Sequence, residues 1–177
     1  MGSQLFLGQI LTTLDLSPSS PLCMPSCGSC TRCLDICPTH AFPSAYVLDS
    51  RLCISYLTIE YRGSIPLELR GKMGNHVFGC DDCQTCCPWV NRFSTVTRQQ
   101  AYNNVIERKA PQLTALARLS ESEFQVMFSG SPVLRPKYEG FMRNVAVALG
   151  NWRSLEARDA IEPLLKHESA LVREHAE

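Results

Sequence analysis

The sequence predicts an α+β protein with a cysteine-rich first half and an α-helical second half. Three observations support this prediction. Residues 2–16 are apolar and β-prone, all ten cysteines lie between Cys23 and Cys87, and helical patterns begin only after Asn91. With 177 residues and 45% hydrophobic content, the chain can form one ordinary core, or a small cofactor module with a second small domain.

The first segment, residues 2–16, predicts a strand or a short extended piece because it is rich in Leu, Ile and Phe. A Pro/Ser loop at residues 17–21 ends the segment. The rest of the chain offers no evident partner strand. The longest apolar runs are far shorter than the roughly 18–20 residues of a membrane span, so we expect no association with a membrane.

The start of the chain has neither a basic leader nor a small-residue cleavage site, so it does not indicate a signal peptide. We therefore expect a cytoplasmic protein. Disulfides are disfavoured in that reducing compartment. Ten cysteines in one chain then indicate metal ligation by thiolates.

The strongest motif is the run Cys27, Cys30, Cys33 and Cys37 followed by Pro38, which is typical of bacterial ferredoxins. Three thiolates at positions i, i+3 and i+6 of a tight loop can reach three irons of one [4Fe-4S] cluster. The fourth cysteine is turned away by the proline and ligates another cluster. The motif therefore requires a second set of cysteines.

The second set is Cys80, Cys83 and Cys87 followed by Pro88, and Cys53 is free to supply the ligand that this run lacks. Pairing by the two-cluster rule predicts two complete ligand sets. One set is Cys27, Cys30, Cys33 and Cys87, and the other is Cys37, Cys53, Cys80 and Cys83. Two cysteines are left over as small spare side chains, Cys23 and Cys86.

Two alternatives to these ligand sets exist. Cys86 competes with Cys87, since it lies three residues after Cys83, but Val90 would then stand where the fourth cysteine belongs, and Pro88 favours Cys87. A pair of zinc sites is the other interpretation, although such sites prefer two separated Cys-x2-Cys pairs. We favour two clusters. The predicted fold class is therefore α+β, with a bacterial ferredoxin-like two-cluster domain at residues 23–91 before the helical region.

Residues 92–177 predict helices. Ser120 and Glu123 form a capping box before an apolar run that starts at Phe124. The segments Arg143-Asn144-Val145-Ala146 and Arg173-Glu174-His175-Ala176 show a similar pattern thirty residues apart, which suggests short HEAT-like repeats. Two helices that simply pack together are the alternative. An unfinished repeat would leave an apolar face uncovered, so we expect the natural protein to continue past the last residue.

The charge is unevenly spread, although the net charge is zero. Residues 1–91 hold five Lys/Arg against seven Asp/Glu, whereas residues 92–143 hold eight against four. This local positive excess suits a polyanionic partner. A solvated charged surface explains the excess equally well.

Several segments resemble one family, epoxyqueuosine reductase, the cobalamin and iron-sulfur enzyme of the last step of queuosine formation in tRNA. The helical tail also fits this family, so the resemblance spans essentially the whole chain. The matching runs are Gly2-Ser3 with Phe6-Leu7-Gly8, the ferredoxin run at 27–39, Arg-Leu-Cys-Ile-Ser-Tyr-Leu-Thr-Ile-Glu at 51–60, and Gly-Cys-Asp-Asp-Cys-Gln at 79–84.

The resemblance implies that electrons pass through both clusters to a cobalamin, whose reduced cobalt removes the epoxide oxygen from the modified base. It implies cobalamin contacts at Leu7, Leu11, Ser55 and Asp81. An upstream domain is expected to supply most of the cobalamin site and an acidic proton donor, so residues 1–22 are interpreted as the end of that domain. No catalytic residue is expected in this chain, which alone should be inactive.

The resemblance also implies that the helical region faces tRNA, with Arg62 and Arg143 at positions of basic residues that contact phosphate. An external electron donor and a monomeric state are further expectations. The chain departs from the family pattern at Gln4, which replaces an aromatic residue, at His76, which replaces an arginine, and in the adjacent pair Cys86-Cys87.

Two other functions compete with this interpretation. A stand-alone two-cluster ferredoxin-type electron carrier would need no cobalamin or RNA, but it has little use for the long helical tail. An iron-sulfur module that binds RNA without redox work is the other. Cobalamin retention, tRNA binding and cluster reduction, measured on the same sample, separate the three functions.

Overall fold

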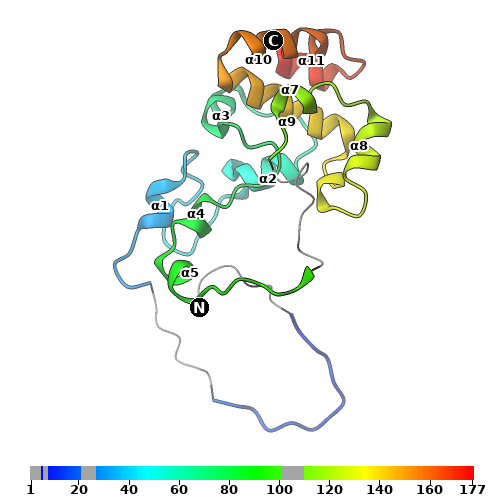
Figure 1. Cartoon of the computed structure of the whole chain (residues 1–177). Helices are drawn as coiled ribbons and strands as arrows, with labels where there is room; N and C mark the ends of the chain where they lie inside the picture. Colours follow the sequence, from blue (N-terminus) through cyan, green and yellow to red (C-terminus); the bar gives the residue numbers. More distant parts are fainter. Residues whose placement is uncertain (1–4, 6–7, 21–26, 101–109) are drawn as a thin grey trace.

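The computed structural model describes residues 5, 8–20, 27–100 and 110–177. In that part of the chain, short helices and turns make up the cysteine-bearing half, and longer helices gather at the C-terminal end (Figure 1). None of the helices described is both long and apolar enough to cross a membrane.

The cysteine-bearing half is built from five short helices, two 3-10 turns and the loops between them. Cys53 and Cys87 stand directly before two of the helices as N-cap residues, and Pro88 occupies a first-turn position where its missing N–H is not needed. The helices are α1 (Arg32–Ile36), α2 (Ile54–Ile59), α3 (Leu67–Arg70), α4 (Asp82–Thr85) and α5 (Pro88–Phe93), and the turns are η1 (Ser50–Leu52) and η2 (Gly71–Met73).

The second half is helical, as predicted. The capping box is confirmed, because the Ser120 hydroxyl accepts the backbone N–H of Glu123 while the Glu123 carboxylate accepts the backbone N–H of Ser120. Ser154 and Ser169 cap two further helices through their hydroxyls. The elements are α7 (Leu113–Leu116), α8 (Glu121–Met127), η4 (Pro132–Leu134), α9 (Lys137–Trp152), α10 (Leu155–Ile161), η5 (Glu162–Lys166) and α11 (Ala170–Ala176).

Helix α9 lies at the centre of the molecule. Ten consecutive residues, 140–149, are buried, so the helix is covered on all sides rather than along one stripe. Helices α7, α10 and α11 pack against it, and on another side it reaches α2 and η2. The helical region and the cysteine-bearing region therefore share α9.

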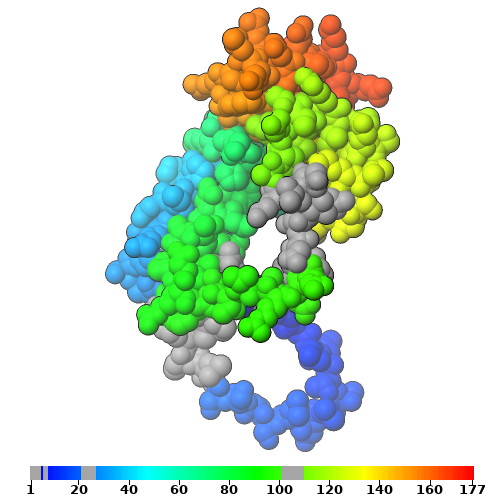
Figure 2. All heavy atoms as spheres, viewed as in Figure 1, coloured from blue at the N-terminus to red at the C-terminus, as the bar shows by residue number. Residues whose placement is uncertain are grey.

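Two apolar cores lie on either side of α9. The larger one belongs to the helical region and is centred on three phenylalanines, Phe124, Phe128 and Phe141. The smaller one combines Val147 of α9 with residues of α2, the following loop, α3 and η2, which are Ile54, Leu57, Ile65, Leu69 and Met73. In Figure 2 the C-terminal helices form one end of the molecule and lie directly on the central region.

The predicted strand at residues 2–16 is wrong for the described residues of that segment. Residues 8–20 are exposed and run away from the helices (Figures 1 and 2). A strand needs a neighbour for its backbone hydrogen bonds, and the described part of the chain provides none. The β pairing found there is one isolated bridge, Ser44 with Val47, so this part is mostly helical rather than α+β. The HEAT-like repeat stays a prediction.

Candidate metal centre

Four thiols predicted to hold one cluster lie near one another. Cys83 interacts electrostatically with Cys80, Cys53 and Cys37, and also with Cys33 of the other predicted set. These cysteines come from separate elements, because Cys53 caps α2, Cys37 ends α1, and Cys80 and Cys83 lie before and inside α4. The packing of α1 against α4 brings them together. The predicted set is thus gathered in one place, while ligation of a cluster by it remains a prediction.

Three members of the other predicted set gather around Cys86, which interacts with Cys33, Cys87 and Cys30. The fourth member, Cys27, is joined to Cys30 by a turn in which the Cys30 N–H donates to the Cys27 carbonyl at 3.2 Å. Cys27 and Cys30 are exposed, in contrast to the half-buried thiols Cys37, Cys53, Cys80 and Cys83. The chain therefore holds two thiol groups that share the edge of α1 and α4.

The electrostatics of the half-buried thiols fit a metal centre. Burial, followed by the neighbouring thiols Cys80 and Cys53, raises the pKa of Cys83 to about 11. Burial also raises the pKa of Cys80. Several thiolates in so small a space disfavour one another, and a bound cationic centre reverses this effect. Grouped thiols are the donors that iron-sulfur clusters use, so the residues present fit such a cluster.

The spare cysteine Cys86 lies among the predicted ligands. Its Sγ atom donates a hydrogen bond to the carbonyl of Cys83 at 3.5 Å. Burial raises the pKa of Cys86, as it does for Cys80 and Cys83. The assignment of Cys87 rather than Cys86 as a ligand stays a prediction. The other spare cysteine, Cys23, lies outside the described residues.

The sulfur of Cys37 has hydrogen-bond partners of its own. The backbone N–H of Ala41 donates to Cys37 Sγ at 3.3 Å, and the Thr39 hydroxyl lies 3.5 Å from the same sulfur. Hydrogen bonds to a ligating sulfur stabilise its negative charge and raise the reduction potential of the cluster. Thr39 and Ala41 are both buried, so this arrangement is well defined.

Thr58 joins two cysteine-bearing segments. Its buried hydroxyl donates to the carbonyl of Ile54 at 2.8 Å and accepts the backbone N–H of Gly79 at 2.9 Å. Gly79 has a φ of +77°, a conformation that side chains other than glycine rarely adopt, and it stands directly before Cys80. Helix α2, which begins after Cys53, is thus fastened to the loop that presents Cys80.

Arg143 holds the loop that follows α2. Its guanidinium donates to the carbonyls of Leu57 at 2.7 Å, Tyr61 at 2.9 Å and Gly63 at 2.8 Å. The side chain is fully buried, and burial, together with the neighbouring Arg62, lowers the pKa of Arg143 to about 10, which leaves it charged at neutral pH. A phosphate contact, as predicted for Arg143, needs an accessible guanidinium. The structure therefore corrects that prediction and gives Arg143 a role in holding the backbone on both sides of Arg62.

Asn144, the next residue in α9, holds two further segments. Its amide Nδ2 donates to the carbonyl of Thr58 at 2.8 Å and to that of Val77 at 2.9 Å. Its Oδ1 accepts the Nε and Nη2 groups of Arg143 at 3.1 and 2.9 Å. Asn144 is fully buried, and each of these hydrogen bonds is buried or partly buried. Neither Asn144 nor Thr58 was among the predicted site residues.

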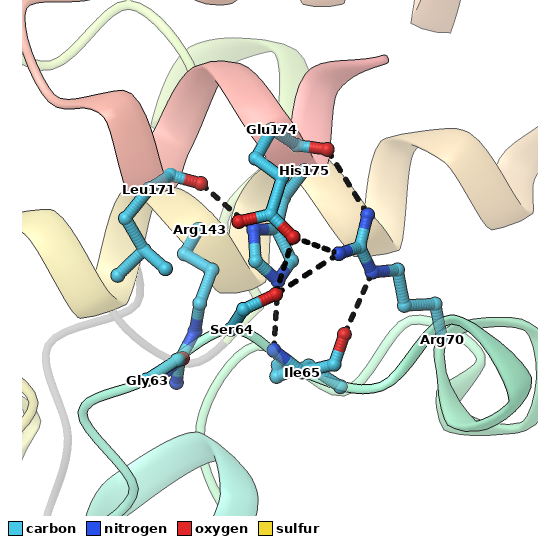
Figure 3. A network of polar contacts seen from close by, with 8 residues as sticks. All are labelled: Gly63, Ser64, Ile65, Arg70, Arg143, Leu171, Glu174 and His175. Atoms are coloured by element: carbon cyan, nitrogen blue, oxygen red, sulfur yellow. Dashed lines mark hydrogen bonds and ion pairs between the residues drawn. The ribbon is translucent and has the colours of Figure 1, made fainter.

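The second half of the repeated pattern, in α11, faces the same loop (Figure 3). His175 Nε2 accepts the backbone N–H of Ile65 at 2.9 Å, so its Nδ1 carries the proton and donates to the carbonyl of Leu171 at 2.7 Å. Arg70 forms an ion pair of 2.9 Å with the Glu174 carboxylate. Residues of α9 and α11 thus both bind the segment 57–65, although Arg173, which corresponds to Arg143 in the repeated pattern, donates instead to the carbonyls of His167 and Glu168.

The predicted cobalamin contacts are scattered over accessible positions. Ser55 is half-buried in the first turn of α2, and Asp81 is exposed, its carboxylate accepting the side-chain amide of Gln84 at 2.8 Å. Leu11 is 98% exposed, so its apolar side chain is accessible to a ligand or to another domain. Leu7 lies outside the described residues. A role of these four residues in binding cobalamin remains a prediction.

Arg62 is exposed, in contrast to Arg143. Its guanidinium donates to the carbonyls of Ile59 at 2.8 Å and Arg135 at 2.7 Å. Arginine has five N–H donors, so others remain for a phosphate. Arg135 forms an ion pair of 2.7 Å with Glu60 on the same surface.

His76 lies beside Cys80, a member of the group formed by Cys37, Cys53, Cys80 and Cys83. Its Nε2 is 3.6 Å from a carboxylate oxygen of Asp82, and its Nδ1 is 2.8 Å from the carbonyl of Met73. Ligand atoms of His76, Cys80 and Asp82 all lie within 4.8 Å of one another. The departure from the family pattern at this position is therefore next to a predicted cluster ligand.

Comparison with protein families finds one domain match. Residues 26–90 match the 4Fe-4S double cluster binding domain. The match covers both cysteine runs and Cys53, and it ends within α5, two residues after Pro88.

Comparison with curated proteins finds epoxyqueuosine reductases. The enzyme of Pseudomonas aeruginosa is 48% identical over 177 residues, which cover 99% of this chain and 49% of that protein. The enzyme of Escherichia coli (strain K12) is 44% identical over 171 residues, which cover 93% of this chain and 45% of that protein. The chain thus spans about half the length of the curated relatives it matches.

Solved structures show the same similarity. An epoxyqueuosine reductase crystallised with an epoxyqueuosine-modified tRNA-Tyr stem loop has a TM-score of 0.81 and 33% identity, covering 90% of this chain and 42% of that one. The Bacillus subtilis epoxyqueuosine reductase has a TM-score of 0.80 and 32% identity, covering 91% and 43%. The arrangement of helices described above is therefore shared with these proteins.

Proposed function

Because the chain is homologous to the C-terminal part of the epoxyqueuosine reductases, we propose that it is the electron-relay and tRNA-facing part of such an enzyme. In this proposal the chain holds two [4Fe-4S] clusters and shares a cobalamin with a further domain. The enzyme reduces epoxyqueuosine to queuosine in tRNA. One cluster is held by Cys27, Cys30, Cys33 and Cys87, and the other by Cys37, Cys53, Cys80 and Cys83.

The observation that carries the proposal is the gathering of the predicted ligands in two groups. The groups share the edge between α1 and α4, and the domain match over residues 26–90 covers both. Zinc sites do not require the crossing of ligands between the two cysteine runs, whereas the bacterial two-cluster arrangement does. Cys37 of the first run lies close enough to Cys83 of the second run to act on it electrostatically, which is consistent with this crossing, and Cys33 of the first run does so as well.

The chemistry requires an electron relay. Removal of an epoxide oxygen to leave an alkene takes up two electrons and two protons and releases one water molecule. Iron-sulfur clusters supply single electrons when bound, and cobalamin supplies the reactive cobalt. The residues of this chain contribute thiolates to the clusters, hydrogen bonds from Thr39 and Ala41 to the Cys37 sulfur, and accessible contacts at Leu11, Ser55 and Asp81.

The tRNA-facing role is supported by the surface near Arg62. Arg143 binds the carbonyls on both sides of Arg62, at Tyr61 and Gly63, and so fixes the backbone that presents the exposed guanidinium. An arginine held in this way contacts a phosphate with less loss of conformational entropy than one on a mobile loop. The homologous structure with a tRNA stem loop is consistent with such a contact. In this proposal α9, α10 and α11 form the HEAT-like surface.

Anaerobic reconstitution of the chain tests this proposal. We expect about eight iron per chain, a visible absorption that bleaches on reduction, and salt-dependent binding of a tRNA anticodon stem loop. Bound iron without stem-loop binding would favour the stand-alone electron carrier. About two zinc per chain in place of iron would contradict both the proposed electron relay and the stand-alone electron carrier.

A further inference from the structure

Helix α9 contacts the cysteine-bearing region through two asparagines whose contacts differ. Asn144 donates its amide to Thr58 and Val77, at 2.8 and 2.9 Å, and Asn151 donates its amide to Arg70 and Gly74, both at 2.8 Å. All four acceptors are backbone carbonyls. The two asparagines thus make the same kind of contact to different segments.

The segments held by Asn144 are the ones that present cluster ligands. Thr58 lies in α2, whose N-cap is Cys53, and Val77 lies two residues before Gly79 and three before Cys80. The Thr58 hydroxyl adds a direct hydrogen bond between the same two segments, because it accepts the Gly79 N–H at 2.9 Å. One amide therefore fixes the distance between α2 and the loop before Cys80.

We propose that Asn144 is a positioning residue for the second cluster, the one assigned to Cys37, Cys53, Cys80 and Cys83. Asn144 holds the helix that follows Cys53 and the loop that precedes Cys80 at a fixed distance from each other. The inference rests on the proposed function, since it assumes that Cys53 and Cys80 ligate the same cluster. Asn144 touches no thiol. It acts through Thr58 and the backbone, as outer partners of metal ligands commonly do.

Burial explains how Asn144, a residue of the helical region, can fix the distance between these two segments. Asn144, Thr58 and Arg143 are each fully buried. The side-chain oxygen Oδ1 of Asn144 accepts two hydrogen bonds from Arg143, so the amide cannot turn away. A buried hydrogen bond whose donor is fixed defines distance more strictly than apolar contact does. The predicted ligands of the other cluster, Cys27, Cys30, Cys33 and Cys87, lie on different segments, in the loop before α1, in α1 and directly before α5.

The sharpest test exchanges one amide for a carboxylate. Asn144→Asp keeps the shape and the acceptor for Arg143 but removes both donations to carbonyls. Asn151→Asp is the matched control, because it makes the same substitution in the same helix and removes two donations to segments without cysteines. Thr58→Val, which removes the hydroxyl that Gly79 uses, is the second variant and should act in the same direction as Asn144→Asp.

The measurement is the anaerobic release of iron from the reconstituted full chain to a chelator, with a redox titration followed by electron paramagnetic resonance. For Asn144→Asp we expect half of the iron to leave about tenfold faster than in the wild type, and the other half at the wild-type rate. The reduction potential of one cluster should shift while that of the other stays. The shifted cluster should be the one that Cys53→Ala abolishes. Circular dichroism checks that the helices persist.

Two results would overturn the inference. Asn144→Asp and Thr58→Val could release iron like the wild type, or Asn151→Asp could have the same effect as Asn144→Asp, which would mean general destabilisation. A wild-type chain that fails to bind about eight iron contradicts the proposed function instead. If Asn144→Asp does not fold, the comparison of Thr58→Val with Asn151→Asp decides by the same criteria.

Discussion

The cysteine-bearing region and the helical region differ in how much apolar surface they bury. Around α9 the helical region buries a continuous apolar core that contains Phe124, Phe128 and Phe141. In the cysteine-bearing region, the stretch of residues 27–53 buries only Thr39 and Ala41 among its side chains. A segment with so little buried apolar surface needs another source of stability, and a bound metal centre is the usual one.

The comparison predicts a large difference when iron is removed. Chelation of iron from the reconstituted chain should make residues 27–53 and 80–93 susceptible to proteolysis, because the proposed ligation would add to the packing of α1 against α4. The helical region at 110–177 should survive as a protected fragment, since its core does not include the clusters. Limited proteolysis with mass spectrometry measures both. Equal protection of both regions after chelation would contradict the comparison.

A mutation in the larger core should give the next largest effect. The Phe124 ring lies 4.8 Å from that of Phe141 and 5.4 Å from that of Phe128, measured between centroids, and it is fully buried. Phe124→Ala should lower the free energy of unfolding of the helical region by about 3–5 kcal/mol. Chemical denaturation followed by circular dichroism measures this change.

Val126→Ala is the control for this mutation, because Val126 lies in the same helix and is 74% exposed. Its expected effect is within about 0.5 kcal/mol. The iron content of the Phe124→Ala protein under native conditions should stay unchanged. Loss of iron from that variant would show that the two regions are not independent in stability.

The junction between the regions should respond to pH. Burial lowers the pKa of His175 below its ordinary value of 6.5, and Arg70 and Arg143 lower it too, whereas Glu174 and the Leu171 carbonyl oppose the shift. The unfolded chain therefore takes up a proton at a higher pH than the folded chain. The stability from neutral His175 is complete above about pH 6.5 and is lost as the pH falls through the lowered value.

Thermal unfolding between pH 7.5 and 5.5 tests this expectation. The midpoint of the wild type should fall as the pH is lowered, because protonation of Nε2 removes the acceptor for the Ile65 N–H. His175→Gln keeps an acceptor without a titrating group, so its midpoint should depend less on pH. A variant with the same pH dependence as the wild type would remove His175 from the explanation.

The smallest effect is expected at the surface. Arg62→Ala should weaken binding of a tRNA anticodon stem loop by a few fold and reduce the dependence of log K on log salt concentration by about one unit, because one phosphate contact is lost. Arg51→Ala, at an exposed position of η1 outside the proposed HEAT-like surface, serves as a control for the loss of one positive charge. Equal changes in both variants would show that the effect is general electrostatics rather than a contact by Arg62.

Cysteine spacing predicted that these thiols gather near α1 and α4, because chain geometry limits which thiols of a tight loop reach one cluster, while ligation by them stays a prediction. The capping box at Ser120 and Glu123 was predictable for a similar reason, since it is a local interaction. The strand at residues 2–16 was predicted from composition alone, although a strand depends on a partner elsewhere. Arg143 was predicted to contact phosphate from its position in the family resemblance, and its burial follows from tertiary packing of α9 between two cores.

The most direct test of the central claim is the iron content of cysteine variants after anaerobic reconstitution. The two-cluster arrangement predicts about eight iron per wild-type chain, about four for Cys53→Ala, and about eight for Cys86→Ala. Cys53→Ala should also lose one of two reduction steps. Full iron content in Cys53→Ala, or loss of half the iron in Cys86→Ala, would contradict the crossed ligand sets on which the account depends.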